Sequence, residues 1–153
     1  MRMDDAAAVL GRADFFDMCT DEQRAMLGFA SDRQRVDADE IVYKAGDVPK
    51  GAYVLISGTL KARHEGPEAG KPYALSEPGS IVSAMALILS KPRPVTITAV
   101  IDCETLFVPR QAFLKLLEQS PGLAQRAVER IQSDLGAYLG ALEPMGNKMR
   151  DGH

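Results

Sequence analysis

The segment Ile41–Leu60, IVYKAGDVPKGAYVLISGTL, carries the clearest structural signal in this chain. Two runs of β-branched and aromatic residues, Ile41–Tyr43 and Ala52–Ile56, alternate with turns at Gly46-Asp47 and Ser57-Gly58. Such runs favour β-strands, because branched and aromatic side chains fit a pleated, half-buried surface. Gly58 between two short strands predicts a tight hairpin, since glycine adopts a positive φ without a steric penalty.

Similar strand signals continue outward from this segment and cover residues 33–108. Further β-rich runs, each ended by a turn, are Thr59–Ala62, Val95–Ile101 and Glu104–Val108. Asp102-Cys103 is expected to form the turn that separates the last two runs. Many short strands at this spacing are typical of a sandwich, jelly roll or barrel, and not of an α/β sheet. We therefore expect a mainly β domain with a β-roll over 33–108.

Helical signals precede the strands. Within residues 4–31, Thr20 and Gln23 have the spacing of a capping box, in which two side chains satisfy the first backbone N–H groups of a helix. Phe15-Phe16 lies between the two helical stretches and predicts a tight turn that places both rings in the core.

Helical signals also follow the strands, over residues 110–142. A longer helix is expected to begin at Ser120-Pro121 and to end near Leu142, because Pro144 cannot continue it. We therefore expect one domain over 1–143 and a flexible tail over 144–153.

The composition limits the possible classes of function. The chain has 153 residues, of which 46% are hydrophobic and 25% charged, as is typical of one globular domain. No apolar run approaches the ~20 residues that a membrane span needs. A net charge of −3 without a basic cluster argues against binding to nucleic acid. Cys19 and Cys103 lack metal or redox spacing, and the N-terminus lacks a secretory pattern, so we expect a cytoplasmic protein.

Arg93 is the residue that most suggests a ligand. It lies in the segment GSIVSAMALILSKPRPVTITA, Gly79–Ala99, between a short apolar helix and a β-rich run. An arginine beside a helix start can clamp an anion between its guanidinium and backbone N–H groups. Two other interpretations stay open: Arg93 is paired with an acidic neighbour such as Glu77, or it is solvated. Ser83 likewise is either a helix cap that faces an anion or only a cap.

The last long helix carries a regular apolar stripe. Its members recur at spacings of three and four residues and are Ala124, Val128, Ile131, Leu135, Tyr138 and Leu142. One interpretation is an amphipathic helix that lies on its own β-roll. The other is a helix-on-helix interface in a homodimer, formed by Val128, Ile131, Leu135, Tyr138 and Leu142.

Taken together, this order of elements resembles the cyclic nucleotide-binding domain, the sensor module of the catabolite activator protein family and of kinase regulatory subunits. The resemblance is carried by Ile41–Asp47 and Gly51–Leu60, with their glycine turns and tyrosine-bearing strand, and covers about residues 10–142. It implies a jelly roll whose phosphate-binding cassette runs from Gly79 to Arg93. Cyclic AMP or cyclic GMP is then the implied ligand.

The resemblance also implies a set of ligand-binding residues: Ser83, Ala84, Met85, Ala86, Arg93 and Thr96. Arg93 would pair with the cyclic phosphate, with backbone N–H groups near Ser83 to Ala86 as further donors. The chain departs from the family at two points. Val82-Ser83-Ala84 replaces the family's Phe-Gly-Glu, so the carboxylate for the ribose 2′-hydroxyl is missing, and Pro94 has no N–H.

Enzyme classes fit the sequence poorly. His64 and His153 are the two histidines, too few for a cupin-type metal site or a catalytic triad. We therefore expect a non-enzymatic, stand-alone regulatory module that binds a cyclic nucleotide or related anion and signals through its C-terminal helices. The alternative is a dimeric protein-interaction scaffold with a vestigial pocket. Family members that regulate transcription carry a helix-turn-helix domain after the long helix, and this sequence ends soon after Leu142, so direct DNA reading is not expected.

Overall fold

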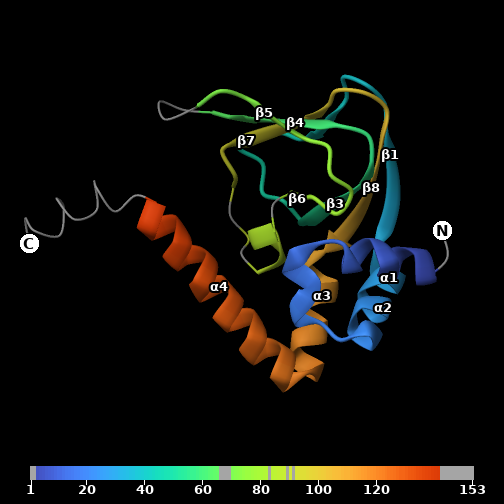
Figure 1. Cartoon of the computed structure of the whole chain (residues 1–153), viewed down its shortest axis with the longest axis vertical. Helices are drawn as coiled ribbons and strands as arrows, with labels where there is room; N and C mark the ends of the chain where they lie inside the picture. The colour runs from blue at the N-terminus through green and yellow to red at the C-terminus, as the bar shows by residue number, and fades with distance from the viewer. Residues whose placement is uncertain (1–2, 66–69, 83, 89, 91, 142–153) are drawn as a thin grey trace, which may run out of the picture. The chain divides into compact units, whose positions relative to one another are not determined.

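Two four-stranded antiparallel sheets form the β-roll (Figure 1). The computed structural model describes residues 3–65, 70–82, 84–88, 90 and 92–141, and the side chains of residues 3, 4, 85, 131 and 133–141 lie outside the described set. In spatial order, the first sheet contains β1 (Asp32–Val36), β8 (Cys103–Pro109), β3 (Gly51–Ser57) and β6 (Ile81–Val82). The second contains β2 (Ile41–Tyr43), β7 (Val95–Ala99), β4 (Leu60–His64) and β5 (Tyr73–Leu75).

The core lies between the two sheets. Alternate side chains of β7 are buried, because successive residues of a strand point to opposite faces. The apolar residues that both sheets contribute are Val36, Tyr43, Leu55, Leu60, Ala62, Val82, Val95, Ile97, Ala99 and Cys103. Burial raises the pKa of the Cys103 thiol, which agrees with a core residue and not a reactive one. The expected mainly β jelly roll with flanking helices is confirmed.

The predicted hairpin at Ser57-Gly58 is wrong. Strand β3 pairs with β6 and β8, whereas β4 pairs with β5 and β7, so Gly58 forms a corner at which the chain changes sheet. Its φ of 98° is positive, as predicted. Two strand boundaries also differ from expectation: β7 ends at Ala99, and Cys103 begins β8.

Helices α1 (Met3–Gly11), η1 (a 3₁₀-helix, Asp14–Met18), α2 (Asp21–Ala30) and α3 (Arg110–Gln119) complete this unit, residues 1–119. Phe15 and Phe16 are buried, and their ring centroids lie 5.8 and 6.4 Å from that of Phe113 on α3. The prediction that the turn places two aromatic rings in the core is confirmed. This aromatic cluster joins the segment before the roll to the helix after it.

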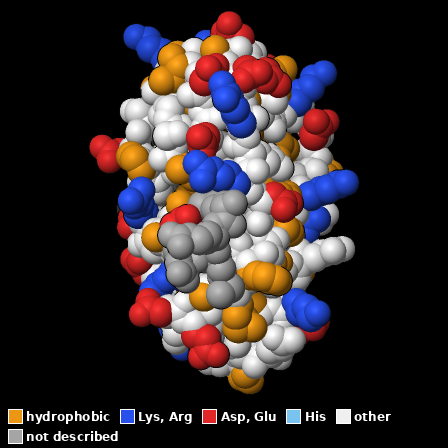
Figure 2. Space-filling model, turned by 90° about the vertical axis from the view of Figure 1, so that its right-hand side faces the viewer, with side chains coloured by type: hydrophobic (Ala, Val, Ile, Leu, Met, Phe, Trp, Pro, Cys, Tyr) orange, Lys and Arg blue, Asp and Glu red, His pale blue; other side chains and the backbone are white. Residues whose placement is uncertain are grey.

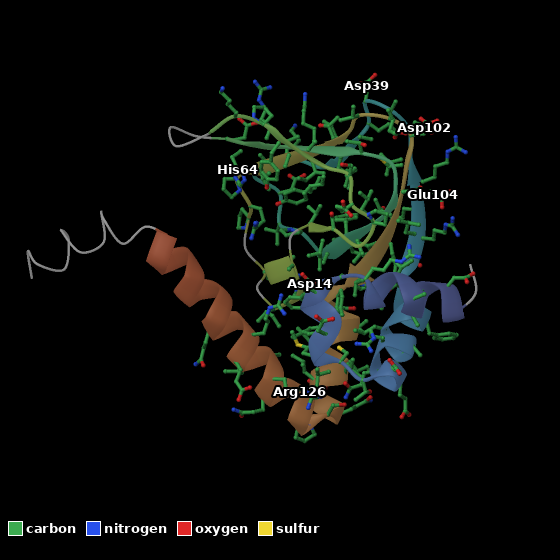
Figure 3. All side chains as sticks on the ribbon, viewed as in Figure 1. Asp14, Asp39, His64, Asp102, Glu104 and Arg126 are labelled. Carbon is green, nitrogen blue, oxygen red and sulfur yellow. The ribbon has the colours of Figure 1, made fainter. Side chains whose placement is uncertain are left out.

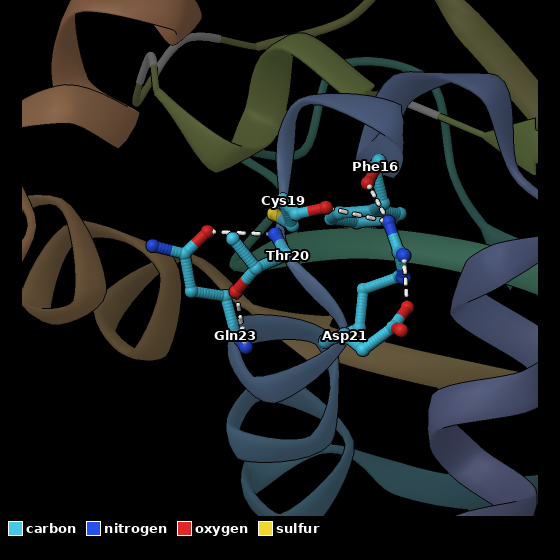
Figure 4. A network of polar contacts seen from close by, with 6 residues as sticks. Phe16, Cys19, Thr20, Asp21 and Gln23 are labelled. Carbon is cyan, nitrogen blue, oxygen red and sulfur yellow. Dashed lines mark hydrogen bonds and ion pairs between the residues drawn. The ribbon is translucent and has the colours of Figure 1, made fainter.

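The start of α2 shows the predicted capping box (Figure 4). Thr20 Oγ1 accepts from the backbone N–H of Gln23 at 3.1 Å, and Gln23 Oε1 accepts from that of Thr20 at 2.9 Å. Arg24 donates to the carbonyl oxygens of Phe16 and Cys19 at 2.8 and 2.7 Å. These bonds satisfy groups at the helix end that would otherwise lack partners.

A second unit, residues 120–153, contains helix α4 (Pro121–Ala141). The helix begins at Pro121, where the sequence predicts it. Val128 of the expected dimer stripe has a half-exposed side chain. The side chains of Ile131, Leu135 and Tyr138 lie outside the described residues, as do Leu142 and the tail.

Charged side chains of both signs are interspersed on the face of the molecule that Figure 2 shows. The large apolar side chains that are exposed include Phe29 on α2, at 79% exposure. None of the helices in the described part of the chain combines the length and apolar character needed to span a membrane.

Gly58→Ala should destabilise the domain more than Gly46→Ala. Both glycines have a positive φ, which costs an alanine about 1–2 kcal/mol. At Gly58 an added Cβ would also lie 2.6 Å from Cys103 Sγ and 2.7 Å from the Asp102 carbonyl oxygen, whereas at Gly46 nothing lies within 4 Å. We expect a further loss of about 1–3 kcal/mol for Gly58→Ala, measured by urea unfolding. Equal losses for the two variants would contradict the packed corner.

Candidate functional site

A cavity of about 260 Å³ opens at the end of the roll where β4, β5, β6 and β7 meet. Three of the residues that line the cavity are buried and belong to the core: Val82, Val95 and Ile97. The described lining residues are His64, Tyr73, Leu75, Ile81, Val82, Ala84, Arg93, Val95 and Ile97. We call this space the Arg93 cavity.

The backbone of Arg93 is held firmly by the loop that follows β2. Its N–H donates to Tyr43 Oη at 3.1 Å and more weakly to the Asp47 carbonyl oxygen at 3.4 Å. Its own carbonyl oxygen accepts from the Gly46 N–H at 2.9 Å. Hydrogen bonds to both the N–H and the carbonyl oxygen of Arg93 therefore fix the backbone from which its side chain extends.

The side chain of Arg93, by contrast, is not satisfied. Its Nε is buried, and no described residue accepts a hydrogen bond from it. The alternative of an ion pair with Glu77 is not supported, since no such pair occurs among the described residues. A buried donor without a partner costs about 1–3 kcal/mol. Arg93 also lines the cavity.

The short helix of the predicted cassette is η2, a 3₁₀-helix over Ala84–Leu87. Ala84 lines the Arg93 cavity, whereas Ala86 and Leu87 are buried in the core. A helix of four residues carries little dipole, so the positive helix end that the sequence suggests contributes little here. Ser83 lies outside the described residues, as does the side chain of Met85.

Arg110, the first residue of α3, ties η2 to the rest of the domain. Its Nη1 donates to the carbonyl oxygens of Pro49 at 2.8 Å and Ala86 at 3.2 Å. One guanidinium thus joins the loop before β3, the cassette helix and the start of α3. The sequence analysis missed this residue, because nothing in the local pattern shows that three distant segments meet there.

The structure does not bring Thr96 to the cavity, contrary to the expectation from the family resemblance. Its neighbours Val95 and Ile97 face the cavity, and successive residues of a strand point to opposite faces. Thr96 Oγ1 instead accepts a hydrogen bond from the Ala45 N–H at 3.0 Å. This bond helps to position the loop that holds the Arg93 backbone.

His64 and Tyr73 form the aromatic part of the cavity lining. Their rings are stacked, with centroids 5.9 Å apart and an interplanar angle of 28°. Both side chains line the cavity and are also exposed to solvent. In Figure 3 His64 lies far from the labelled acidic residues Asp102 and Glu104. The pairing of β4 with β5 creates this contact, and the short β5 gives no clear strand signal.

Tyr43 and Tyr53 line a separate groove of about 350 Å³. The Tyr53 ring packs against Phe107 with centroids 5.1 Å apart, and burial, with a smaller effect of Tyr43, raises the pKa of Tyr53. These contacts indicate that the Tyr53 ring has a structural role.

Comparison with known proteins identifies the family. Residues 33–120 match the family model described as "Cyclic nucleotide-binding domain". A solved cyclic nucleotide-binding-like protein from Brucella abortus is 30% identical, with a TM-score of 0.63 over 74% of this chain and 98% of that one. The N-terminal domain of a Streptomyces coelicolor transcriptional regulator has a TM-score of 0.74 at 23% identity, over 88% of this chain and 94% of that one.

Among curated relatives, lysophospholipase nte1 of Aspergillus niger is 31% identical over 99 residues, or 63% of this chain. The match spans 6% of the length of that lysophospholipase. The chain belongs to the cyclic nucleotide-binding domain family. The segment Gly79–Arg93, which resembles the phosphate-binding cassette of that family, contributes Ile81, Val82, Ala84 and Arg93 to the lining of the Arg93 cavity.

Replacing each of two arginines with methionine should separate a binding role from a structural one. Arg93→Met removes an unsatisfied buried donor, so the free energy of unfolding without ligand should be unchanged or should rise by up to about 1–3 kcal/mol. Arg110→Met removes two hydrogen bonds to carbonyl oxygens and should lower it by about 1–3 kcal/mol. Denaturant unfolding measures both. Equal destabilisation by the two substitutions would make Arg93 a structural residue.

Proposed function

We propose that this domain is a regulatory module that binds a cyclic nucleotide or a related small anion in the Arg93 cavity. The observation that carries the proposal is the buried Nε of Arg93, from which no residue in the described part of the chain accepts a hydrogen bond, while three hydrogen bonds hold the Arg93 backbone in place. A phosphate or carboxylate oxygen would satisfy this donor in a low-dielectric site, where charge-assisted hydrogen bonds are strong.

The proposed output runs through the C-terminal helices. Arg110 begins α3 and donates to the Ala86 carbonyl oxygen of η2, so a shift of η2 on ligand binding would act directly on α3. A ligand that binds one position of η2 more tightly would shift the population toward the matching position of α3.

Homodimer formation through α4 is a further part of the proposal. Val128 on this helix has an apolar side chain that is half-exposed in the single chain, as is expected of a residue that a second copy would cover. Val128→Glu, with the exposed Gln132→Glu as a matched control on the same helix, should convert dimers to monomers in sedimentation velocity. Dimers that survive Val128→Glu would remove this part of the proposal.

The proposed role is non-enzymatic and cytoplasmic. Within the residues that the structure describes, no three His, Cys, Asp or Glu side chains gather closely enough to hold a metal ion. The Arg93 cavity brings together one guanidinium, one imidazole and one phenol, which suits recognition of an anion.

The second candidate is a protein-interaction scaffold with a vestigial pocket. It is favoured by Ala84, which offers no carboxylate to a ribose hydroxyl, and by Pro94, which has no N–H to donate. Each lost hydrogen bond costs about 0.5–3 kcal/mol, so affinity for a cyclic nucleotide could fall by one or two orders of magnitude.

Isothermal titration calorimetry with cyclic AMP, cyclic GMP and inorganic phosphate distinguishes the two candidates. We expect at least one of them to bind, and Arg93→Met to weaken binding about 10- to 150-fold, because a charge-assisted hydrogen bond is lost. Arg63→Met is the matched control, since Arg63 is an exposed arginine on the neighbouring β4 and does not line the cavity. No heat with any of these ligands at millimolar concentration would favour the scaffold.

A further inference from the structure

The described lining of the Arg93 cavity is mostly apolar. Six of these side chains carry no polar atom, and we call them the apolar wall: Leu75, Ile81, Val82, Ala84, Val95 and Ile97. The polar lining residues of the described set are Arg93, His64 and Tyr73, and no carboxylate is among them. Among the described residues, the cavity therefore combines one guanidinium and the His64 and Tyr73 rings with six apolar side chains.

This distribution favours one kind of ligand body over another. Hydroxyl groups of a sugar ring that press against an apolar wall lose their water partners and gain none, which is unfavourable. An apolar ring in the same position removes hydrocarbon from water on both surfaces, which is favourable. Ala84 is central to this preference, because it places a methyl group where the resemblance to the family would place a carboxylate.

The size and the rim of the cavity add to this preference. About 260 Å³ lies just below the range of roughly 300–1,000 Å³ that is usual for ligand pockets, so a small ligand fits best. The stacked rings of His64 and Tyr73 offer aromatic surface, and aromatic groups pack well edge-to-face or offset against such rings.

From these observations we infer that the Arg93 cavity prefers a small anion with an apolar ring, such as an aryl phosphate or aryl carboxylate, to a ribose-bearing nucleotide. The anionic end pairs with the Arg93 guanidinium, and the ring lies between the apolar wall and the His64–Tyr73 pair. The inference rests on the proposed function, since it requires that Arg93 binds an anion.

Phenyl phosphate and ribose 5-phosphate test the inference, because both are phosphate monoesters and differ in the body attached to the phosphate. Calorimetry of the full chain at about pH 8, where both phosphates are fully ionised, compares them at equal charge. We expect phenyl phosphate to bind at least about tenfold more tightly, a difference of about 1.4 kcal/mol. Ribose 5-phosphate binding as tightly or more tightly would overturn the inference and leave the proposed function standing.

Two variants at Ala84 identify the origin of the preference. Ala84→Glu introduces a carboxylate that repels the anion of both ligands but accepts hydrogen bonds from ribose hydroxyls. The ratio of the phenyl phosphate affinity to the ribose 5-phosphate affinity should therefore fall toward one or below it. Ala84→Gln is the matched control of equal size without charge and should narrow the preference less. A preference that Ala84→Glu leaves unchanged would place the ring elsewhere and overturn the inference.

Arg93→Met separates failure of the inference from failure of the proposed function. Loss of phenyl phosphate binding in this variant, with retention in Arg63→Met, supports both. Phenyl phosphate binding that survives Arg93→Met would overturn the inference, because the anion is then held elsewhere. If neither monoester nor any cyclic nucleotide binds the unmodified chain, the proposed function itself fails.

Discussion

The site depends on the hydrogen bonds between the loop after β2 and the backbone of Arg93. Gly46 donates to the Arg93 carbonyl oxygen, and the Arg93 N–H donates to Tyr43 Oη and to the Asp47 carbonyl oxygen. Because these bonds fix the backbone, the guanidinium stays at the cavity even though no described residue accepts a hydrogen bond from its Nε. The domain tolerates a locally unfavourable group at a place where a ligand could make it favourable, as is common at functional sites.

The same loop also connects the cavity to the helices. Pro49 accepts a hydrogen bond from Arg110 on α3, and this guanidinium also reaches the Ala86 carbonyl oxygen of η2. Arg93 and Arg110 therefore have different roles. The Nε of Arg93 has no hydrogen-bond acceptor among the described residues, which is the basis of the proposed anion site. Arg110 is hydrogen-bonded and links η2 to α3.

The sequence predicts much of the fold because its strongest signals are local. Capping at Thr20, the aromatic turn at Phe15-Phe16 and the positive φ at Gly58 each depend on neighbouring residues alone. Sheet assignment is not local, and so the predicted hairpin at Gly58 proved to be a corner between sheets. Strand β1 also gave no clear signal, since four of its five residues are exposed and polar, and pairing with β8 holds it in the sheet.

In the candidate site, too, the features that depend on strand pairing could not be predicted from the sequence. Resemblance to the family suggested Arg93 and Ala84, and the structure places both at one cavity. Thr96 faces the other side of β7, a difference of one residue in a strand whose alternation the sequence does show. His64 and Tyr73 could not be paired in advance, because their contact depends on the register between β4 and β5.

The ¹H–¹⁵N signal of the Arg93 Nε–H group, assigned by its absence in Arg93→Met, tests the central claim most directly. If the Nε–H group is buried and binds an anion, its hydrogen should exchange slowly with water in the free protein, and its chemical shift should change when inorganic phosphate is added. Exchange as fast as that of the exposed Arg63, with no shift on adding phosphate, would contradict the account.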